Sequence, residues 1–280
     1  MKIAFVILHY KVESITKKCI DYLLEQDYNN FEIVVIDNCS KNGSYEKLVE
    51  EYVHNDLIYF VSVEYNLGFA KANDLGYQIA KHKFGAECIV VINNDLFIKD
   101  TLFCSRLSTY SKKKPFFIMG PDIINKIGEH QNPLVECADN KKKVQQMILR
   151  TRIKIMLLPW LYIVKKKVVK EKSLMQEKST EHQQDVPLHG SCLIFGKKFI
   201  DEFEFPFYPD TFLYGEEDIL YYRAQKKKIT TIYNPDFFVY HVEDVATESI
   251  SKSNKKKRLF ELKNSLNSLR ILEKMMKEDE

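Results

Sequence analysis

The stretch CIVVINND at residues 88–95 joins a continuous apolar run to a polar end, Asn93-Asn94-Asp95. An unbroken apolar run of this kind is typical of a strand buried on both faces of a parallel sheet. Two earlier runs, Lys2 to Leu8 and Glu32 to Ile36, also lead into polar residues. The sequence therefore predicts parallel strands whose carboxyl ends share one polar edge, where open α/β sheets bind their ligands.

Helical segments alternate with these strands. Apolar residues recur at helical spacing between Ser14 and Glu25, and helices are also predicted over Tyr45 to Tyr52 and Ala70 to Lys83. A further strand is expected over Ile58 to Val63. Strand-helix-strand alternation predicts an α/β fold with a mostly parallel sheet flanked by helices.

The second half of the chain is less regular. HGSCLIF at residues 189–195 predicts a turn followed by a strand, and an aromatic loop enters a helix at Glu216-Glu217-Asp218. Another strand is expected over Thr230 to Val239. From Lys256 onward, leucines every three or four residues predict one amphipathic helix. Its apolar stripe packs either on the core or on a second copy in a homodimer.

Composition narrows the class of protein. The chain has 280 residues, of which 45% are hydrophobic, so it can bury a sizeable core. Its six cysteines include no CxxC pair, which argues against a zinc ribbon, a redox dithiol and a secreted disulfide framework. The first apolar run is too short for a signal sequence or a membrane span. We therefore expect a cytoplasmic globular protein.

Positive charge is concentrated in residues 141–172. This segment holds 11 of the 42 Lys and Arg residues and one acid, Glu171, for a net charge of +10, while the remainder carries −7. Inside it, Ile155 to Val164 is uncharged and includes Trp160 and Tyr162. Two interpretations stay open: a segment in the interface of an anionic membrane, or a solvated helical hairpin packed on the core. No nucleic-acid-binding motif accompanies the charge, which argues against a nucleic-acid partner.

Three acidic elements stand at predicted element ends, namely Asp37, Asp95 and the trio Glu216-Glu217-Asp218. Each alone also suits a turn or a helix start. Together they match the needs of a reaction with a phosphate leaving group. One carboxylate holds a hard cation against a diphosphate, and another takes a proton from the attacking hydroxyl.

Seven motifs, taken in order and spacing, resemble the GT-A-fold, family 2 inverting glycosyltransferases. They are IAFVILHYK, VVIDNCSKNGS, NLGFAKANDLG, VVINNDL, HGSCLIF, FLYGEEDILYYRA and YNPDFFVYH. The chain is most similar to the rhamnosyltransferase-like branch that builds bacterial O-antigen, capsule and cell-wall polysaccharide. The resemblance covers residues 1 to about 110 and 187 to about 265.

The resemblance implies a GT-A fold, with a Rossmann-like nucleotide-binding sheet, a basic helical insertion and a C-terminal helix. Residues 1–110 would form the half that binds the nucleotide sugar, and residues 187–250 the acceptor-binding and catalytic half. Residues 111–186 would be a variable, cationic insertion on the acceptor or membrane side, and residues 251–280 a C-terminal amphipathic helix.

The resemblance also implies roles for single residues. Contacts to the nucleotide sugar are expected from His9, Tyr10, Asp37, Asn66, Gly68, Phe69, Asn73, Asn93 and Asn94. Asn93-Asn94-Asp95 takes the place of the family's DxD motif, so Asp95 would hold Mg²⁺ or Mn²⁺, with His241 as a further ligand. Because Asn93 replaces the first acid of that motif, we expect weaker cation binding than two carboxylates would give.

The acidic trio matches the family motif that supplies the catalytic base. A gapless alignment favours Glu217, whereas the literal Glu-Asp pair favours Asp218. Adjacent helical side chains diverge by about 100°, so only one of them can face the acceptor hydroxyl. Glu216 and the turn His189-Gly190-Ser191 would line the donor and acceptor side of the site.

The implied activity is that of a metal-dependent hexosyl- or rhamnosyltransferase. It would transfer a sugar, with inversion, from a UDP- or dTDP-type donor to a hydroxyl of a growing, lipid-linked surface polysaccharide. The enzyme would be peripheral on the inner face of a bacterial cell membrane. Two alternatives are a non-catalytic sugar-nucleotide-binding module and a nucleotidyltransferase. The latter needs a glycine-rich loop after the first strand, where this chain has HYKVES.

Overall fold

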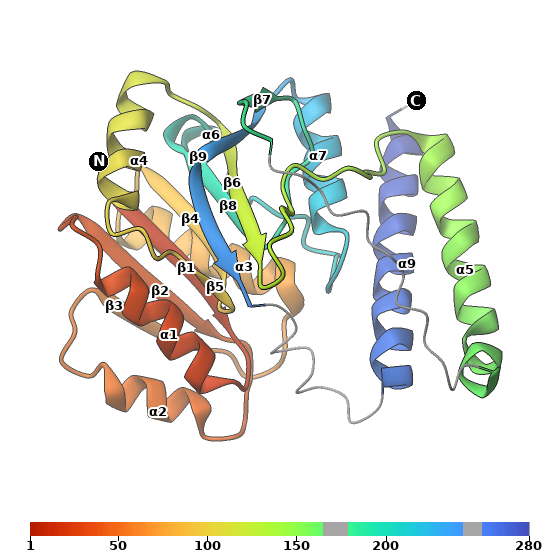
Figure 1. Cartoon of the computed structure of the whole chain (residues 1–280), viewed down its shortest axis with the longest axis horizontal. Helices are drawn as coiled ribbons and strands as arrows, with labels where there is room; N and C mark the ends of the chain where they lie inside the picture. The colour runs from red at the N-terminus through yellow and green to blue at the C-terminus, as the bar shows by residue number, and fades with distance from the viewer. Residues whose placement is uncertain (165–178, 243–253, 280) are drawn as a thin grey trace.

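The computed structural model describes residues 1–164, 179–242 and 254–279, which form an α/β fold around one sheet (Figure 1). The strands are β1 (Ile3–His9), β2 (Phe31–Asp37), β3 (Ile58–Ser62), β4 (Cys88–Asn93), β5 (Leu96–Phe97), β6 (Ile118–Asn125), β7 (Gln183–Gln184), β8 (Cys192–Gly196) and β9 (Thr231–His241). The helices are α1 (Glu13–Leu24), α2 (Ser44–Glu51), α3 (Gly68–Gln78), α4 (Phe103–Lys113), α5 (Lys141–Val164), α6 (Lys197–Glu202), α7 (Glu216–Lys226) and α9 (Asn254–Glu278). A π-helical turn, η1 (Ile79–Lys83), continues α3.

The sheet is mixed but mostly parallel. Its spatial order is β3-β2-β1-β4-β8-β6-β9-β5, with β7 also paired to β9. Strands β1 to β4, β6 and β9 run in one direction, and β5, β7 and β8 run in the other. The expected α/β fold with a mostly parallel sheet is therefore confirmed.

Both faces of the sheet are buried, which explains the unbroken apolar runs. Along β1, Ile3, Phe5 and Ile7 pack toward α1, α2 and α4, while Ala4 and Val6 pack toward α3, α6 and α7. Side chains alternate between faces because the strand period is two residues. The helices form one layer on each side.

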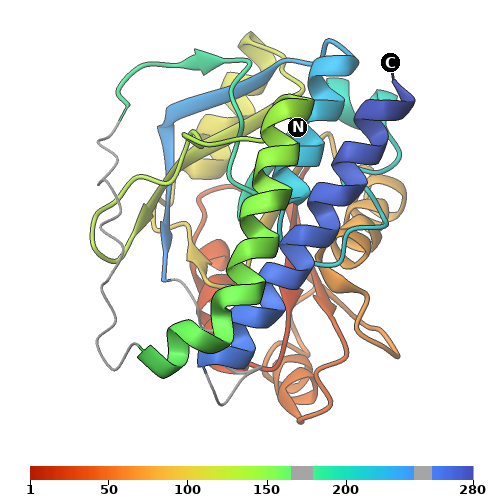
Figure 2. The same cartoon turned by 90° about the vertical axis from the view of Figure 1, so that its right-hand side faces the viewer.

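Helices α5 and α9 add an outer layer (Figure 2). They lie side by side, and α7 lies between this pair and the sheet. On α9, Leu266, Leu269, Leu272 and Met276 are buried against α5 and α7. The leucine stripe therefore packs within its own chain. It does not by itself indicate a homodimer.

Two features of residues 111–186 were not expected. Strand β6 is an inner strand of the sheet. The cationic segment begins as one long helix, α5. The side chains of Trp160 and Tyr162, and residues 165–172, lie outside the described residues. No helix among the described residues combines the length and the apolarity that crossing a bilayer requires.

A glycine sets the distance between α3 and the sheet. A Cβ atom on Gly76 would collide with Val6 Cγ1 and come within 3.2 Å of Ile36 Cγ1. Both contacts are fully buried core side chains of β1 and β2. Close packing leaves them little room to move.

We expect Gly76→Ala to lower the free energy of unfolding by about 1–3 kcal/mol, because the added methyl group overpacks this contact. Chemical denaturation measures the loss. Combining it with Val6→Ala, which removes the colliding methyl group, should cost less than the sum of the two single changes. Strict additivity would contradict the predicted contact.

Candidate active site

A cavity of about 320 Å³ opens at the carboxyl ends of β1, β2 and β4. It is lined by Leu8, Tyr10, Asn38, Asn66, Gly68, Phe69, Asn93, Asn94, Asp95, Phe212, Leu213 and Phe260. We call it the strand-end cavity. Seven of the residues expected to contact a nucleotide sugar or a metal line it, namely Tyr10, Asn66, Gly68, Phe69, Asn93, Asn94 and Asp95.

A tight turn before α3 builds one wall of this cavity. Gly68 adopts a left-handed φ of 79°, and its Cα faces Phe212 so closely that a Cβ would collide with it. The Phe69 amide donates to the Phe212 carbonyl at 2.6 Å. Side-chain amides fix the turn, because Asn38 Oδ1 accepts from the Leu67 amide and Asn66 Oδ1 from the Gly68 amide. The aromatic loop before α7 is thereby joined to the start of α3.

His9 lies beneath the cavity rather than in it, contrary to expectation. The side chain is fully buried, and its ring nitrogens hydrogen-bond Thr16 Oγ1 at 2.7 Å and Ser44 Oγ at 2.9 Å. Burial lowers the pKa of His9 to about 4, against a smaller opposing effect of Asp37. The neutral ring therefore ties β1 to α1 and α2, and it has no free nitrogen for a ligand.

Asp37 and Asn73 are also buried and absent from the cavity lining. The Asp37 carboxylate accepts from the Ser40 amide and hydroxyl and from Ser62 Oγ. Asn73 donates to the Phe69 carbonyl, while its Oδ1 has no hydrogen-bond partner among the described residues. Both residues support the walls, and a direct ligand contact from either stays a prediction.

Asp95 and His241 face each other where β5 pairs with β9. The Val242 amide donates to the Asp95 carbonyl at 2.9 Å, and His241 Nε2 lies 3.5 Å from Asp95 Oδ1. His241 Nδ1 hydrogen-bonds Gln131 Oε1 at 2.7 Å. Because an amide oxygen only accepts, Nδ1 donates this hydrogen bond, and Nε2 is the ring nitrogen that faces the carboxylate. Gln131 was not anticipated from the sequence, which gives no signal for this contact.

The Asp95–His241 pair fits a divalent cation. Asp95 Oδ1 is buried and accepts no hydrogen bond from any described residue. Carboxylate oxygens and imidazole nitrogens are both ligands that divalent cations accept. The described ranges hold no cluster of three or more His, Cys, Asp or Glu side chains suited to a metal. Further ligands would therefore have to come from water or from a bound phosphate.

The His189-Gly190-Ser191 turn connects this pair to α7. The Asn93 amide donates to the Ser191 carbonyl at 2.8 Å, and the His189 and His241 ring centroids lie 6.0 Å apart. Desolvation, followed by the nearby His241, lowers the pKa of His189 to about 4. The neutral ring accepts from the Ser191 amide through Nδ1. The turn therefore adds no positive charge to the site.

Glu217 reaches this turn from the first residues of α7. A Cβ on Gly190 would lie 3.5 Å from Glu217 Oε2, so the carboxylate stands directly against the glycine. Desolvation, and then the charge of Asp218, raises the pKa of Glu217 to about 7. A carboxylate with a pKa near neutrality is suited to accepting a proton.

The other two acids of the trio point elsewhere. Asp218 accepts from the Ala138 amide at 3.0 Å and from the Cys137 thiol. Glu216 is buried, and its Oε1 has no hydrogen-bond partner among the described residues. Burial, and then Glu217, raises the pKa of Glu216 to about 8. Glu216 is thus a buried helix-start residue rather than part of an open loop.

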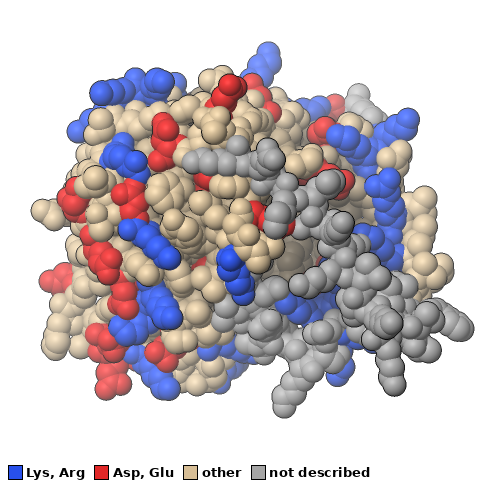
Figure 3. Space-filling model, in the orientation of Figure 1, with Lys and Arg blue, Asp and Glu red and all other residues tan. Residues whose placement is uncertain are grey.

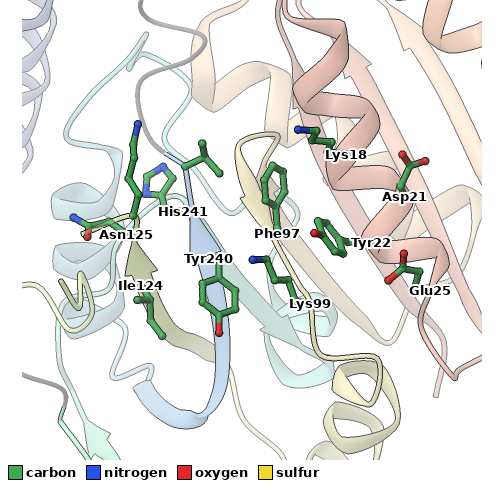
Figure 4. Close-up of a pocket in the computed structure, with 12 residues that line it drawn as sticks. Lys18, Asp21, Tyr22, Glu25, Phe97, Lys99, Ile124, Asn125, Tyr240 and His241 are labelled. Carbon is green, nitrogen blue, oxygen red and sulfur yellow. The ribbon is translucent and has the colours of Figure 1, made fainter. Parts of the chain in front are cut away.

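A second cavity, of about 450 Å³, is lined in part by His241 (Figure 4). It lies between α1, β5 and the ends of β6 and β9, and Tyr22, Phe97 and Tyr240 give it an aromatic lining. His241 lines this cavity, while its neighbour Asp95 lines the strand-end cavity. No sequence pattern predicts this space, because its residues come from four separate elements.

We expect Glu216→Gln to alter how stability depends on pH. Because the folded state keeps a proton that the unfolded chain loses above pH 4.5, Glu216 makes the wild type less stable as pH rises from 4.5 to about 8. A glutamine stays neutral, so the variant gains on the wild type through this window. Denaturation across the window measures the difference, with Glu50→Gln on the exposed face of α2 as control. Parallel curves for wild type and Glu216→Gln would contradict the burial of a protonated Glu216.

Sequence comparison gives the family. The sequence model of glycosyl transferase family 2 matches residues 4–164. This match includes residues 111–164, which the motif resemblance left out. "Glycosyltransferase GlyG" of Streptococcus pneumoniae serotype 4 is 23% identical over 118 residues, covering 42% of this chain and 38% of GlyG. "Uncharacterized glycosyltransferase EpsJ" of Bacillus subtilis is 19% identical over 196 residues, covering 68% of this chain and 55% of EpsJ. The chain therefore spans about half or less of the length of these relatives.

Solved structures share the fold. Residues 1–349 of S. aureus TarS superpose with a TM-score of 0.57 at 15% identity, over 95% of this chain and 71% of that one. The mannosyltransferase PcManGT of Pyrobaculum calidifontis, solved with GDP-Man and Mn²⁺, gives 0.53 at 13% identity over 95% of this chain and 69% of that one. TarS has also been solved with UDP-GlcNAc. These similarities confirm the GT-A fold class.

Proposed function

The chain belongs to glycosyl transferase family 2, and from that premise we propose that it transfers a sugar from a nucleoside-diphosphate sugar to an acceptor hydroxyl with inversion. The observation that carries the proposal is that Asp95 and Glu217, 122 positions apart in the numbering, are connected through one turn, 189–191. Asp95 lines the strand-end cavity, and Glu217 lies on the other side of the turn. The reaction needs two carboxylates in such separate positions, one to bind a cation and one to accept a proton.

The strand-end cavity is the proposed donor site. Asparagine side chains line it, including Asn38, Asn66 and Asn93. Aromatic surface comes from Tyr10, Phe69 and Phe212. This combination suits a base, a ribose and a sugar. The complexes of TarS with UDP-GlcNAc and of PcManGT with GDP-Man support a nucleotide sugar as the donor class. We propose a UDP- or dTDP-type donor carrying a hexose or rhamnose.

Asp95 and His241 are the proposed ligands of Mg²⁺ or Mn²⁺. A bound divalent cation would neutralise charge on the departing diphosphate. Gln131 holds the His241 ring through Nδ1, and the β5–β9 pairing holds Asp95 against it. The cation in the GalNAc-T7 and PcManGT structures is Mn²⁺, which supports a divalent ion in this fold.

Glu217 is the proposed catalytic base. As the acceptor oxygen bonds to the anomeric carbon from the face opposite the diphosphate, the carbon–phosphate-oxygen bond breaks and the hydroxyl proton passes to the Glu217 carboxylate. Asp218 is less suited to this role, because the Ala138 amide and Cys137 thiol already occupy its carboxylate. Desolvation keeps the pKa of Glu217 near the operating pH.

The proposed acceptor is a hydroxyl on a growing, lipid-linked surface polysaccharide. We propose a position on the inner face of a bacterial cell membrane, as in the rhamnosyltransferase-like branch. The segment assignment carries over with one change. Residues 1–110 with β6 would form the donor half, residues 187–250 the catalytic half, and α5 with α9 an outer layer on the acceptor side.

We expect Glu217→Gln to lower kcat by about 10²- to 10⁴-fold with little change in donor affinity, because only proton transfer is lost. Asp218→Asn should lose far less turnover. A radiolabelled-donor transfer assay measures kcat, and calorimetry measures donor binding. A larger loss in Asp218→Asn than in Glu217→Gln would identify Asp218 as the base instead.

We expect Asp95→Asn to weaken Mn²⁺ binding in the presence of UDP by about tenfold or more, because a charged ligand becomes neutral. The electron paramagnetic resonance signal of free Mn²⁺ measures this affinity. Asp236→Asn, on the exposed part of β9, serves as the matched control, since its carboxylate is 69% exposed. Unchanged Mn²⁺ affinity in Asp95→Asn would remove Asp95 from the metal site.

A further inference from the structure

Helix α5 has one face that packs on the protein. Four residues of this face are buried: Val144, Ile148, Thr151 and Leu158. Val144 and Ile148 pack against α9 and α7, and Leu158 lies on the same side of the helix. They recur every three, four or seven residues, as one side of a helix requires. An ordinary surface helix would carry polar residues on the opposite side.

Between Leu149 and Leu157, the opposite side of α5 is instead apolar. Leu149 is 60% exposed, Ile153 42%, Met156 66% and Leu157 41%. At about 100° per residue, Ile153 lies about 180° around the helix from the buried Val144. These four side chains form a contiguous stripe because Ile153 is four residues from Leu149 and from Leu157 and three from Met156. We call this stripe the outer face of α5; the helix itself lies at the front in Figure 2.

Cations border the outer face on both sides. Arg150 and Lys154 lie along one edge and Arg152 along the other, and all three are exposed. Helix α5 contains no Asp or Glu from Lys141 to Val164. Figure 3 shows Lys and Arg along the part of the surface formed by α9 and α5, with uncharged atoms at its outermost edge. An apolar stripe with cations on both edges is the pattern of a helix that lies in a lipid interface.

We propose that the outer face of α5 binds the headgroup region of an anionic lipid bilayer. Leu149, Ile153, Met156 and Leu157 enter the acyl boundary, and the flanking cations contact lipid phosphates. A second copy of the chain is a poorer partner, because self-association through this stripe would bring the flanking cations of two α5 helices together, and α5 has no acid to compensate them. This proposal deepens the proposed function, on which it rests, by seating the enzyme at the surface that carries a lipid-linked acceptor.

Vesicle co-sedimentation of the full chain tests the proposal. We expect binding to vesicles of phosphatidylcholine mixed with phosphatidylglycerol, no binding to phosphatidylcholine alone, and release by salt. Leu149→Gln with Met156→Gln should weaken binding by about tenfold or more, because two apolar side chains that would enter the acyl boundary are lost. The matched control is Val53→Gln with Ile127→Gln. These residues are 64% and 63% exposed and lie outside α5, so that variant should bind like the wild type.

A second pair of variants tests the charge. Arg150→Gln with Lys154→Gln should weaken binding to the anionic vesicles by about tenfold or more, whereas Lys112→Gln with Lys114→Gln near the end of α4 should not. Hydrolysis of a soluble donor is measured on every variant and should stay at the wild-type rate, which separates this proposal from the proposed function.

Three outcomes would overturn the proposal. The first is a wild type that ignores anionic vesicles, and the second is equal loss in the test and control pairs. The third is a concentration-dependent dimer in solution that Leu149→Gln with Met156→Gln abolishes, without vesicle binding. That result would assign the outer face to a second copy of the chain.

Discussion

The site depends on how the main chain is held just beyond β4. On one side, the Asn93 amide donates to the Ser191 carbonyl; on the other, the Val242 amide donates to the Asp95 carbonyl. Leu96 pairs with His241 in the short antiparallel ladder of β5 and β9. These bonds bring residues from three distant parts of the chain into one place. Because they are made by backbone atoms, they fix Asp95 and His241 opposite each other without demanding particular side chains.

The three adjacent acids at the start of α7 lie in three different environments. Successive side chains diverge by about 100°, so each acid meets a different environment. Glu216 is turned into the protein, Glu217 against the Gly190 turn, and Asp218 onto the Ala138 amide. The helix N-terminus favours negative charge, while burial disfavours it. Only Glu217 combines a raised pKa with contact to the turn that leads to Asp95.

Much of the sheet could be predicted because buried parallel strands leave a clear pattern. The ends of β1, β2 and β4 lie within about one residue of the predicted ends, and polar residues follow each of these strands. Strand β6 was missed because Gly120 and Pro121 interrupt it, and its pairing with β9 shifts register between Pro121 and Asp122. A strand that tolerates a proline at such an irregularity gives no continuous signal.

Side-chain environments were harder to predict than elements. His9 stands at a strand end, as a ligand-binding residue would, yet its partners Thr16 and Ser44 come from α1 and α2, whose distance from it the sequence does not give. The outer face of α5 was hidden for a related reason. Two apolar stripes on opposite sides of one helix cancel the amphipathic pattern, so only the packing of α5 on α9 distinguishes them.

The central claim is that Asp95, His241 and Glu217 surround one reaction centre. The most direct measurement is anomalous diffraction from crystals of the protein grown with Mn²⁺ and a nucleoside diphosphate. We expect a single strong Mn²⁺ peak in contact with the Asp95 carboxylate and His241 Nε2, with the diphosphate in the strand-end cavity and Glu217 facing the position of the transferred sugar. A nucleotide bound elsewhere, or a Mn²⁺ peak away from Asp95, would contradict the account.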